Sequence, residues 1–62
     1  MTELDVVVKQ IDEKVEQLKE VLVTGNFESF DGYKKACGEI RGLLIARGYA
    51  LDLKDKLENT DE

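Results

Sequence analysis

Residues 4–22 read LDVVVKQIDEKVEQLKEVL, and the apolar residues of this stretch recur at the spacing of an amphipathic helix. The intervals between them are four, three, four, three and four, so one apolar seam persists for almost three heptad repeats. The seam consists of Leu4, Val8, Ile11, Val15, Leu18 and Leu22. Thr2 and Asp5 form a capping-box pattern at its start, with aspartate replacing the usual glutamate. A first helix is therefore predicted over about residues 2–24, with Val7 and Val21 widening its seam.

The residues that follow this seam predict a tight reversal of the chain. Gly25 suits the left-handed conformation that often follows a helix, and Asn26 is a favoured N-cap for the next one. Ser29 is a competing N-cap. Connections between helices in small bundles are short, so the expected fold is all-α, an antiparallel helical hairpin with a turn at 24–27.

A second helix is predicted over about residues 27–57, followed by an acidic tail at 58–62 that frays. Its apolar positions form a broad stripe of Tyr33, Cys37, Ile40, Leu43, Leu44, Leu51, Leu53 and Leu57. The aromatic residues Phe27, Phe30 and Tyr33 are expected to cover the closed end of the hairpin as core. Arg41 and Arg47 interrupt the stripe, and each is expected to pair with an acid such as Glu39 or one on the first helix.

Beside this stripe runs a ladder of small residues, each four positions after the last: Gly38, Gly42, Ala46 and Ala50. At helical spacing these residues are predicted to share a face on which a neighbouring helix can approach closely. A glycine inside a helix costs about 1 kcal/mol relative to alanine, and tight packing on this face would offset that cost. The ladder therefore predicts an interface.

The two predicted helices differ in length by about two turns. Either the second helix bends near Gly48, or Leu51, Leu53 and Leu57 extend past the first helix and meet another subunit or a larger partner. The predicted interface residues are thus Gly38, Gly42, Ala46, Ala50, Leu51, Leu53 and Leu57.

Length and charge narrow the class of protein. A chain of 62 residues has room for one domain, residues 1–62, which buries only about 60% of its unfolded surface, so completion by association is expected. The net charge is −5, and only residues 25–50 carry a positive balance, which argues against direct nucleic-acid binding. No apolar run approaches the roughly 20 residues of a membrane span, and the acidic N-terminus does not resemble a secretory signal.

The composition also excludes the common catalytic and metal sites. There is no histidine and a single cysteine, so neither a tetrahedral zinc set nor a Ser-His or Cys-His nucleophile is possible. Gly38, Gly42 and Gly48 fall within a helical pattern and form no phosphate loop. We expect no enzymatic activity, cofactor, metal or small-molecule substrate. Cys37 is expected to be a small buried hydrophobe in a reducing setting.

The block Tyr33 to Leu43, YKKACGEIRGL, is followed by Ala46-Arg47 and resembles small helical proteins encoded by tailed bacteriophages. In those proteins an acidic first helix precedes a Tyr-x-x-x-Cys-Gly-x-Ile-Arg-Gly-Leu core, and the resemblance covers residues 27–53. It implies a structural or accessory component of a virion, made in the host cytoplasm, that forms a homo-oligomer or binds a larger phage structural protein. It supplies no binding residues.

Two other functions stay open. A small acidic phage regulator would bind and inhibit a host protein through the acids of the first helix and the tail, and salt would weaken that contact by screening. Assembly through the apolar interface would be far less sensitive to salt. A dimeric adaptor such as an antitoxin is the third possibility.

Overall fold

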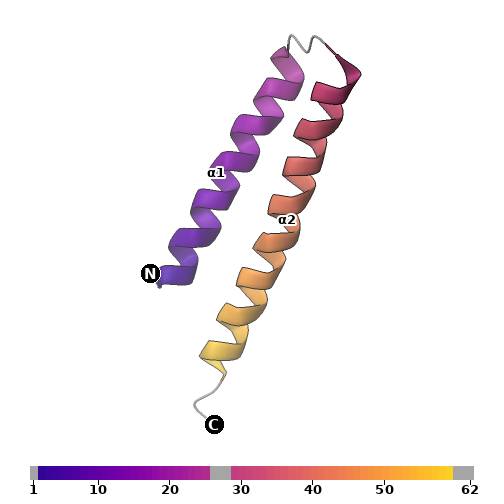
Figure 1. Ribbon diagram of the computed structural model, residues 1–62. Coiled ribbons are helices and arrows are strands. Elements are labelled where there is room, and N and C mark those ends of the chain that lie inside the picture. The colour runs from indigo at the N-terminus through magenta and orange to yellow at the C-terminus, as the bar shows by residue number, and fades with distance from the viewer. Residues whose placement is uncertain (1, 26–28, 60–62) are drawn as a thin grey trace.

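The computed structural model describes residues 2–25 and 29–59. Two helices, α1 (Glu3–Thr24) and α2 (Phe30–Glu58), lie side by side and run in opposite directions (Figure 1). The molecule is a rod with extents of 53 × 18 × 12 Å. The predicted all-α helical hairpin is confirmed.

The start of α1 has the predicted capping box. The backbone N–H of Asp5 donates to the Thr2 hydroxyl at 3.2 Å, and the Thr2 N–H donates to the Asp5 carboxylate at 3.0 Å. These bonds satisfy donors that a helix start otherwise leaves free. At the other end Gly25 has φ −64° and ψ 133°, an extended conformation, so the left-handed conformation predicted for this glycine is wrong.

The start of α2 is three residues later than predicted. Ser29 is its N-cap and accepts a hydrogen bond from the Gly32 N–H at 3.2 Å, whereas Asn26 and Phe27 lie outside the described residues. The helix continues without a break through Gly48 to Glu58, so the alternative of a bend there is wrong. Residues 60–62 of the predicted tail also lie outside the described residues, and Glu58 is still helical.

The core is one thin layer between the two helices. Val15 is 3% exposed and Ala36 is 8% exposed, and they are the buried residues of the described ranges. The other five members of the α1 seam are half-buried, which confirms that this seam faces α2. Val7 and Val21 are exposed, so they do not widen it as predicted.

The side of α2 that faces α1 differs from the predicted stripe. Six residues at intervals of four, three, four, three and four are buried or half-buried, and we call them the contact row: Ala36, Ile40, Leu43, Arg47, Ala50 and Lys54. From the predicted stripe only Ile40, Leu43 and the adjoining Cys37 are covered, and Cys37 is half-buried where full burial was expected. The other five members of that stripe are exposed. The stripe was too broad because α1 covers only one side of the helix.

The aromatic residues near the turn are at the surface. Phe30 is 70% exposed and Tyr33 is also exposed, so the prediction that they belong to the core is wrong. Their rings stack with centroids 6.2 Å apart, and the Lys34 ammonium lies 5.6 Å from the centroid of the Phe30 ring. Phe30 therefore contacts the ring of Tyr33 and the Lys34 cation at the surface.

The longer α2 extends past α1 at one end. Figure 1 shows the C-terminal end of α2 beyond the N-terminal end of α1. Lys54 still contacts Asp5 of α1, so only the last turn extends past, and there Leu57 lines a surface hollow with Leu4. The prediction that Leu51 and Leu53 also extend past α1 is wrong, since both precede Lys54.

Candidate assembly surface

Two ion pairs fix how the helices are aligned. The Lys54 ammonium lies 2.6 Å from the Asp5 carboxylate, and the Arg47 guanidinium donates to Asp12 at 2.7 Å. Asp5 and Asp12 are seven residues apart on α1, and Arg47 and Lys54 are seven residues apart on α2. Seven residues make one heptad. A sliding of one helix along the other by a turn would break both pairs. The Arg47 contact confirms the prediction of an ion pair with an acid on the first helix.

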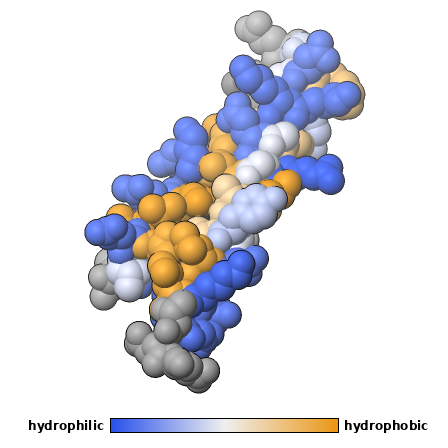
Figure 2. Space-filling view, turned by 60° about the horizontal axis from the view of Figure 1, so that its bottom comes forward, coloured by the Kyte–Doolittle hydropathy of each residue, from blue (hydrophilic) through white to orange (hydrophobic). Residues whose placement is uncertain are grey.

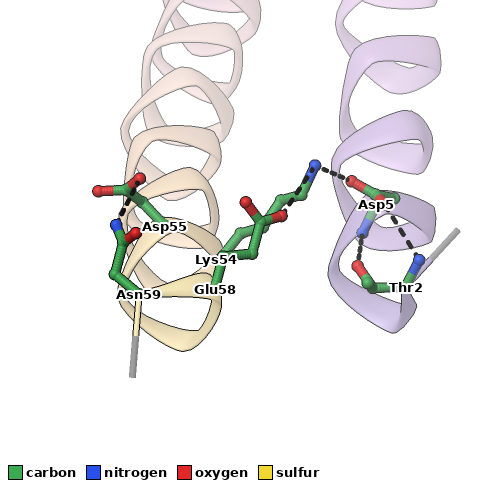
Figure 3. A network of polar contacts seen from close by, with 6 residues as sticks. All are labelled: Thr2, Asp5, Lys54, Asp55, Glu58 and Asn59. Atoms are coloured by element: carbon green, nitrogen blue, oxygen red, sulfur yellow. Dashed lines mark hydrogen bonds and ion pairs between the residues drawn. The ribbon is translucent and has the colours of Figure 1, made fainter. Parts of the chain in front are cut away.

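The Asp5–Lys54 pair is also part of the α1 cap. Figure 3 shows Lys54 reaching from α2 to Asp5, whose carboxylate accepts from the Thr2 backbone as well. The bond from Lys54, followed by the bond from Thr2, lowers the pKa of Asp5 to about 2. The same contact raises the pKa of Lys54, and Glu58, 3.8 Å away, contributes to that rise.

The small-residue ladder does not lie on one face. Gly38, Gly42 and Ala46 are exposed, whereas Ala50 is half-buried in the contact row. Four residues turn a helix by slightly more than one full circle, so the ladder advances about 40° per step and about 120° from Gly38 to Ala50. The prediction of a shared face is wrong for Ala50. A Cβ placed on Gly38 or Gly42 would meet no atom of a neighbouring element within 4 Å, so α1 does not use the space that these glycines leave.

The first three ladder residues belong to a wider exposed surface. Gly42 and Tyr49 each come two positions after a contact-row residue, and two residues turn the helix by about 200°. They therefore lie on the side of α2 that faces away from α1. We call this surface the outer face of α2, and its members are Gly38, Gly42, Ile45, Ala46, Tyr49 and Leu53.

All six members of the outer face are exposed, and Tyr49 is 71% exposed. Ile45 and Tyr49 were not predicted from the sequence, although they stand three and seven positions after Gly42 and so repeat the helical spacing. Among the predicted interface residues, Leu57 adjoins this surface one turn after Leu53 and is exposed. Leu51 does not belong to it, because it lies about 200° from Tyr49, toward α1.

On the side of the rod seen in Figure 2, hydrophobic surface is concentrated at one end. Figure 2 shows hydrophobic side chains gathered over the half of the molecule that carries the start of α1 and the end of α2, while the other half of that view is mostly hydrophilic. Large exposed apolar patches on small proteins mark interaction sites. On the side away from α1, where an amphipathic helix is usually polar, α2 exposes Ile45, Tyr49 and Leu53. The outer face is therefore the candidate functional surface.

No group of three or more His, Cys, Asp or Glu side chains within residues 2–25 and 29–59 is placed to hold a metal ion. In the same ranges neither helix is long and apolar enough to cross a membrane. Arg41 lies beside a shallow surface hollow with Tyr33 and Cys37, and no acid of the described ranges forms an ion pair with it.

Comparison of the chain with protein-family models, with curated proteins and with solved structures found no match. The function is accordingly inferred from the residues and geometry of the hairpin, together with the resemblance of residues 27–53 to small phage helical proteins.

Proposed function

We propose that this chain is a non-enzymatic helical assembly module of a bacteriophage particle, a small structural or accessory protein that binds another helix through the outer face of α2. The observation that carries the proposal is the exposure of Ile45, Tyr49 and Leu53 next to two glycines with open space above them. The resemblance of residues 27–53 to small phage helical proteins supports the virion setting.

The thin core supports a role that depends on association. Within residues 2–25 and 29–59 only two residues are buried. That is few for a domain of this size, in which burial of apolar surface must offset the entropy lost on ordering about 60 residues. Full burial of a large apolar side chain contributes roughly 1.5–3 kcal/mol, so covering the half-exposed side chains of the outer face adds on the order of 1 kcal/mol each. A partner on this face therefore supplies stability that the hairpin lacks.

The alternative, a small acidic regulator that binds and inhibits a host protein, has less support. That function requires carboxylates on α1 that are free to bind a host protein. Two of the α1 carboxylates, those of Asp5 and Asp12, already pair with cations of α2. Binding through the remaining acids would weaken steeply between low and moderate salt, because exposed charge contacts are screened.

The test is incorporation into virus particles. A tagged chain is supplied during infection, particles are purified, and the chain is quantified by mass spectrometry. We expect the wild type in the particles and Gly42→Leu to be lost from them. Gly48→Leu is the matched control, because Gly48 also has open space around it but lies about 120° from Gly42 around the helix.

Two results would contradict the proposal. Absence of the wild-type chain from purified particles would reject the virion role, and a host protein captured in a salt-sensitive way would then favour the regulator. Incorporation of Gly42→Leu at the wild-type level would reject the outer face as the binding surface.

A further inference from the structure

We propose that the outer face of α2 binds the same face of a second copy of this chain, with the two α2 helices antiparallel. This inference rests on the proposed function, in which the outer face is the assembly surface, and it names the partner. The resulting dimer is a single layer of four helices, with both α2 helices inside and both α1 helices outside.

The order of residues along the outer face is self-complementary. In an antiparallel pair centred between Ile45 and Ala46, position 38 is level with position 53 of the other copy, and position 42 is level with position 49. Both pairs join a small residue to a large one: Gly38 with Leu53, and Gly42 with Tyr49. Ile45 and Ala46 lie about 100° apart on opposite edges of the face, so near the midpoint each meets its own counterpart in the second copy. A twofold interface has this property, since residue i contacts j and j contacts i.

Antiparallel packing fills the space over the glycines. No atom of a neighbouring element lies within 4 Å of a Cβ built on Gly38 or Gly42, so each can receive a bulky side chain from the second copy. In the parallel, in-register arrangement Gly42 would face Gly42 and Tyr49 would face Tyr49. That arrangement leaves voids at one level and crowding at another, and both are unfavourable in close-packed interiors.

The charges at the edge of this face agree with the antiparallel direction. Arg41 and Asp52 are eleven residues apart, which places them within about 20° of each other along the same edge. In the antiparallel pair, Arg41 of one copy is level with position 50 of the other. Asp52 is two residues beyond that position, which is about 3 Å along the helix axis. Arg41 of each copy therefore lies beside Asp52 of the other, and no acid of the described ranges pairs with Arg41 within the hairpin.

The exposed area matches what a dimer needs. The chain exposes 5127 Å², whereas a compact globular protein of 7.0 kDa exposes about 4,000 Å². The excess, about 1,100 Å², is comparable to the roughly 800 Å² that each partner buries in a standard stable interface. One second copy is enough to cover it.

The experiment is a size swap across the proposed contact, read by light scattering coupled to size exclusion over a concentration series. The wild type is expected to have the mass of two 7.0 kDa chains. Gly42→Tyr is expected to have the mass of one chain, because the introduced tyrosine of one copy would collide with Tyr49 of the other. The double variant Gly42→Tyr, Tyr49→Gly is expected to form the dimer again, since the large and small partners are merely exchanged.

The control is Gly48→Tyr, the same change at an exposed glycine outside the outer face, and it is expected to stay dimeric. Circular dichroism of each variant verifies that helices form. A second test reverses the edge charges: Arg41→Asp and Asp52→Arg are each expected to raise the dimer Kd by roughly tenfold at low salt, and the double reversal to restore it.

Several results would overturn the inference. A wild-type mass of one chain at every concentration rejects the second copy, while detection of the chain in virus particles separately tests the proposed function. Failure of both double variants to restore the dimer rejects the antiparallel contact. An unchanged dimer in Gly42→Tyr rejects the outer face as the interface between copies.

Discussion

Val15→Ala tests whether the single core layer between α1 and α2 carries the stability of the fold. Val15 is 3% exposed, and the substitution removes two methyl groups from that layer. The transfer contribution is about 0.8 kcal/mol per group, and the cavity left behind adds to it, for a loss of about 2–3 kcal/mol. Alanine is the better helix former by about 0.5 kcal/mol, so the net loss is about 2 kcal/mol per chain.

The matched control is Val23→Ala in the same helix. Val23 is 86% exposed, so this change loses almost no burial and is expected to leave stability equal or slightly higher. Both variants are unfolded in urea and followed by circular dichroism at one fixed chain concentration, because an associating protein has concentration-dependent stability. Total stability for a chain of this size is only a few kcal/mol, so Val15→Ala should lower the urea midpoint by a large fraction. Equal midpoints for the two variants would refute the assignment of the core to this layer.

Three further predictions concern the glycines, the cap of α2 and the Asp5 ion pair. Gly48→Ala is expected to stabilise the chain by about 1 kcal/mol, because the helix gains alanine propensity and the new Cβ meets no neighbouring atom within 4 Å; a lower melting temperature than the wild type would contradict this. Ser29→Ala removes the acceptor for the Gly32 N–H and is expected to cost about 1 kcal/mol in urea denaturation, whereas Ser29→Gly should cost only a few tenths. The folded pKa of Asp5, about 2, lies below its ordinary value of 3.8, so its stabilising contribution is complete above pH 4 and is lost as the pH falls through 2. Asp5→Asn should therefore lower the urea midpoint at pH 7 and approach the wild type near pH 2, and a gap that persists undiminished at pH 2 would show that charge is not the cause.

The fold was predictable because its main determinants are local. The heptad seam from Leu4 to Leu22 has a clear period, and the Thr2 and Asp5 pattern specifies where α1 begins. These features depend on the sequence within one helix and need no knowledge of the neighbour. The choice between Asn26 and Ser29 as the cap of α2 could not be made in this way, because both residue types are favoured at that position.

The side of α2 that faces α1 could not be predicted from hydrophobicity. Arg47 and Lys54 are charged and yet belong to the contact row, where Asp12 and Asp5 on the other helix offset the cost. The pairing of Arg47 with an acid of the first helix was predicted, whereas no role was predicted for Lys54. The seven-residue spacing of these charges on both helices was a readable signal, but its meaning depends on the pairing of the two helices. Conversely, Leu44 and Leu51 are apolar and exposed, because α1 is one narrow helix and covers only one side of α2.

The candidate surface was predictable in part. Gly38, Gly42 and Ala46 were chosen for their size and spacing, and all three lie on the outer face. Leu53 lies there too, although it was chosen because it was expected to extend past the first helix, which is wrong. Ala50 was misplaced because a four-residue interval slowly winds around a helix of 3.6 residues per turn. Tyr49 was not predicted, because the ladder was defined by small residues alone and large side chains on the same face were not included in it.

The double use of the Asp5 carboxylate has a consequence for how the hairpin opens. The same side chain caps the first turn of α1 and holds Lys54 of α2, so fraying of that turn and separation of the helix ends share one contact. Helix ends ordinarily unwind residue by residue, with little effect on the rest of the protein. We therefore expect the first turn of α1 and the last turns of α2 to open together, so that hydrogen exchange at Val6 and at Lys54 reports the same opening event.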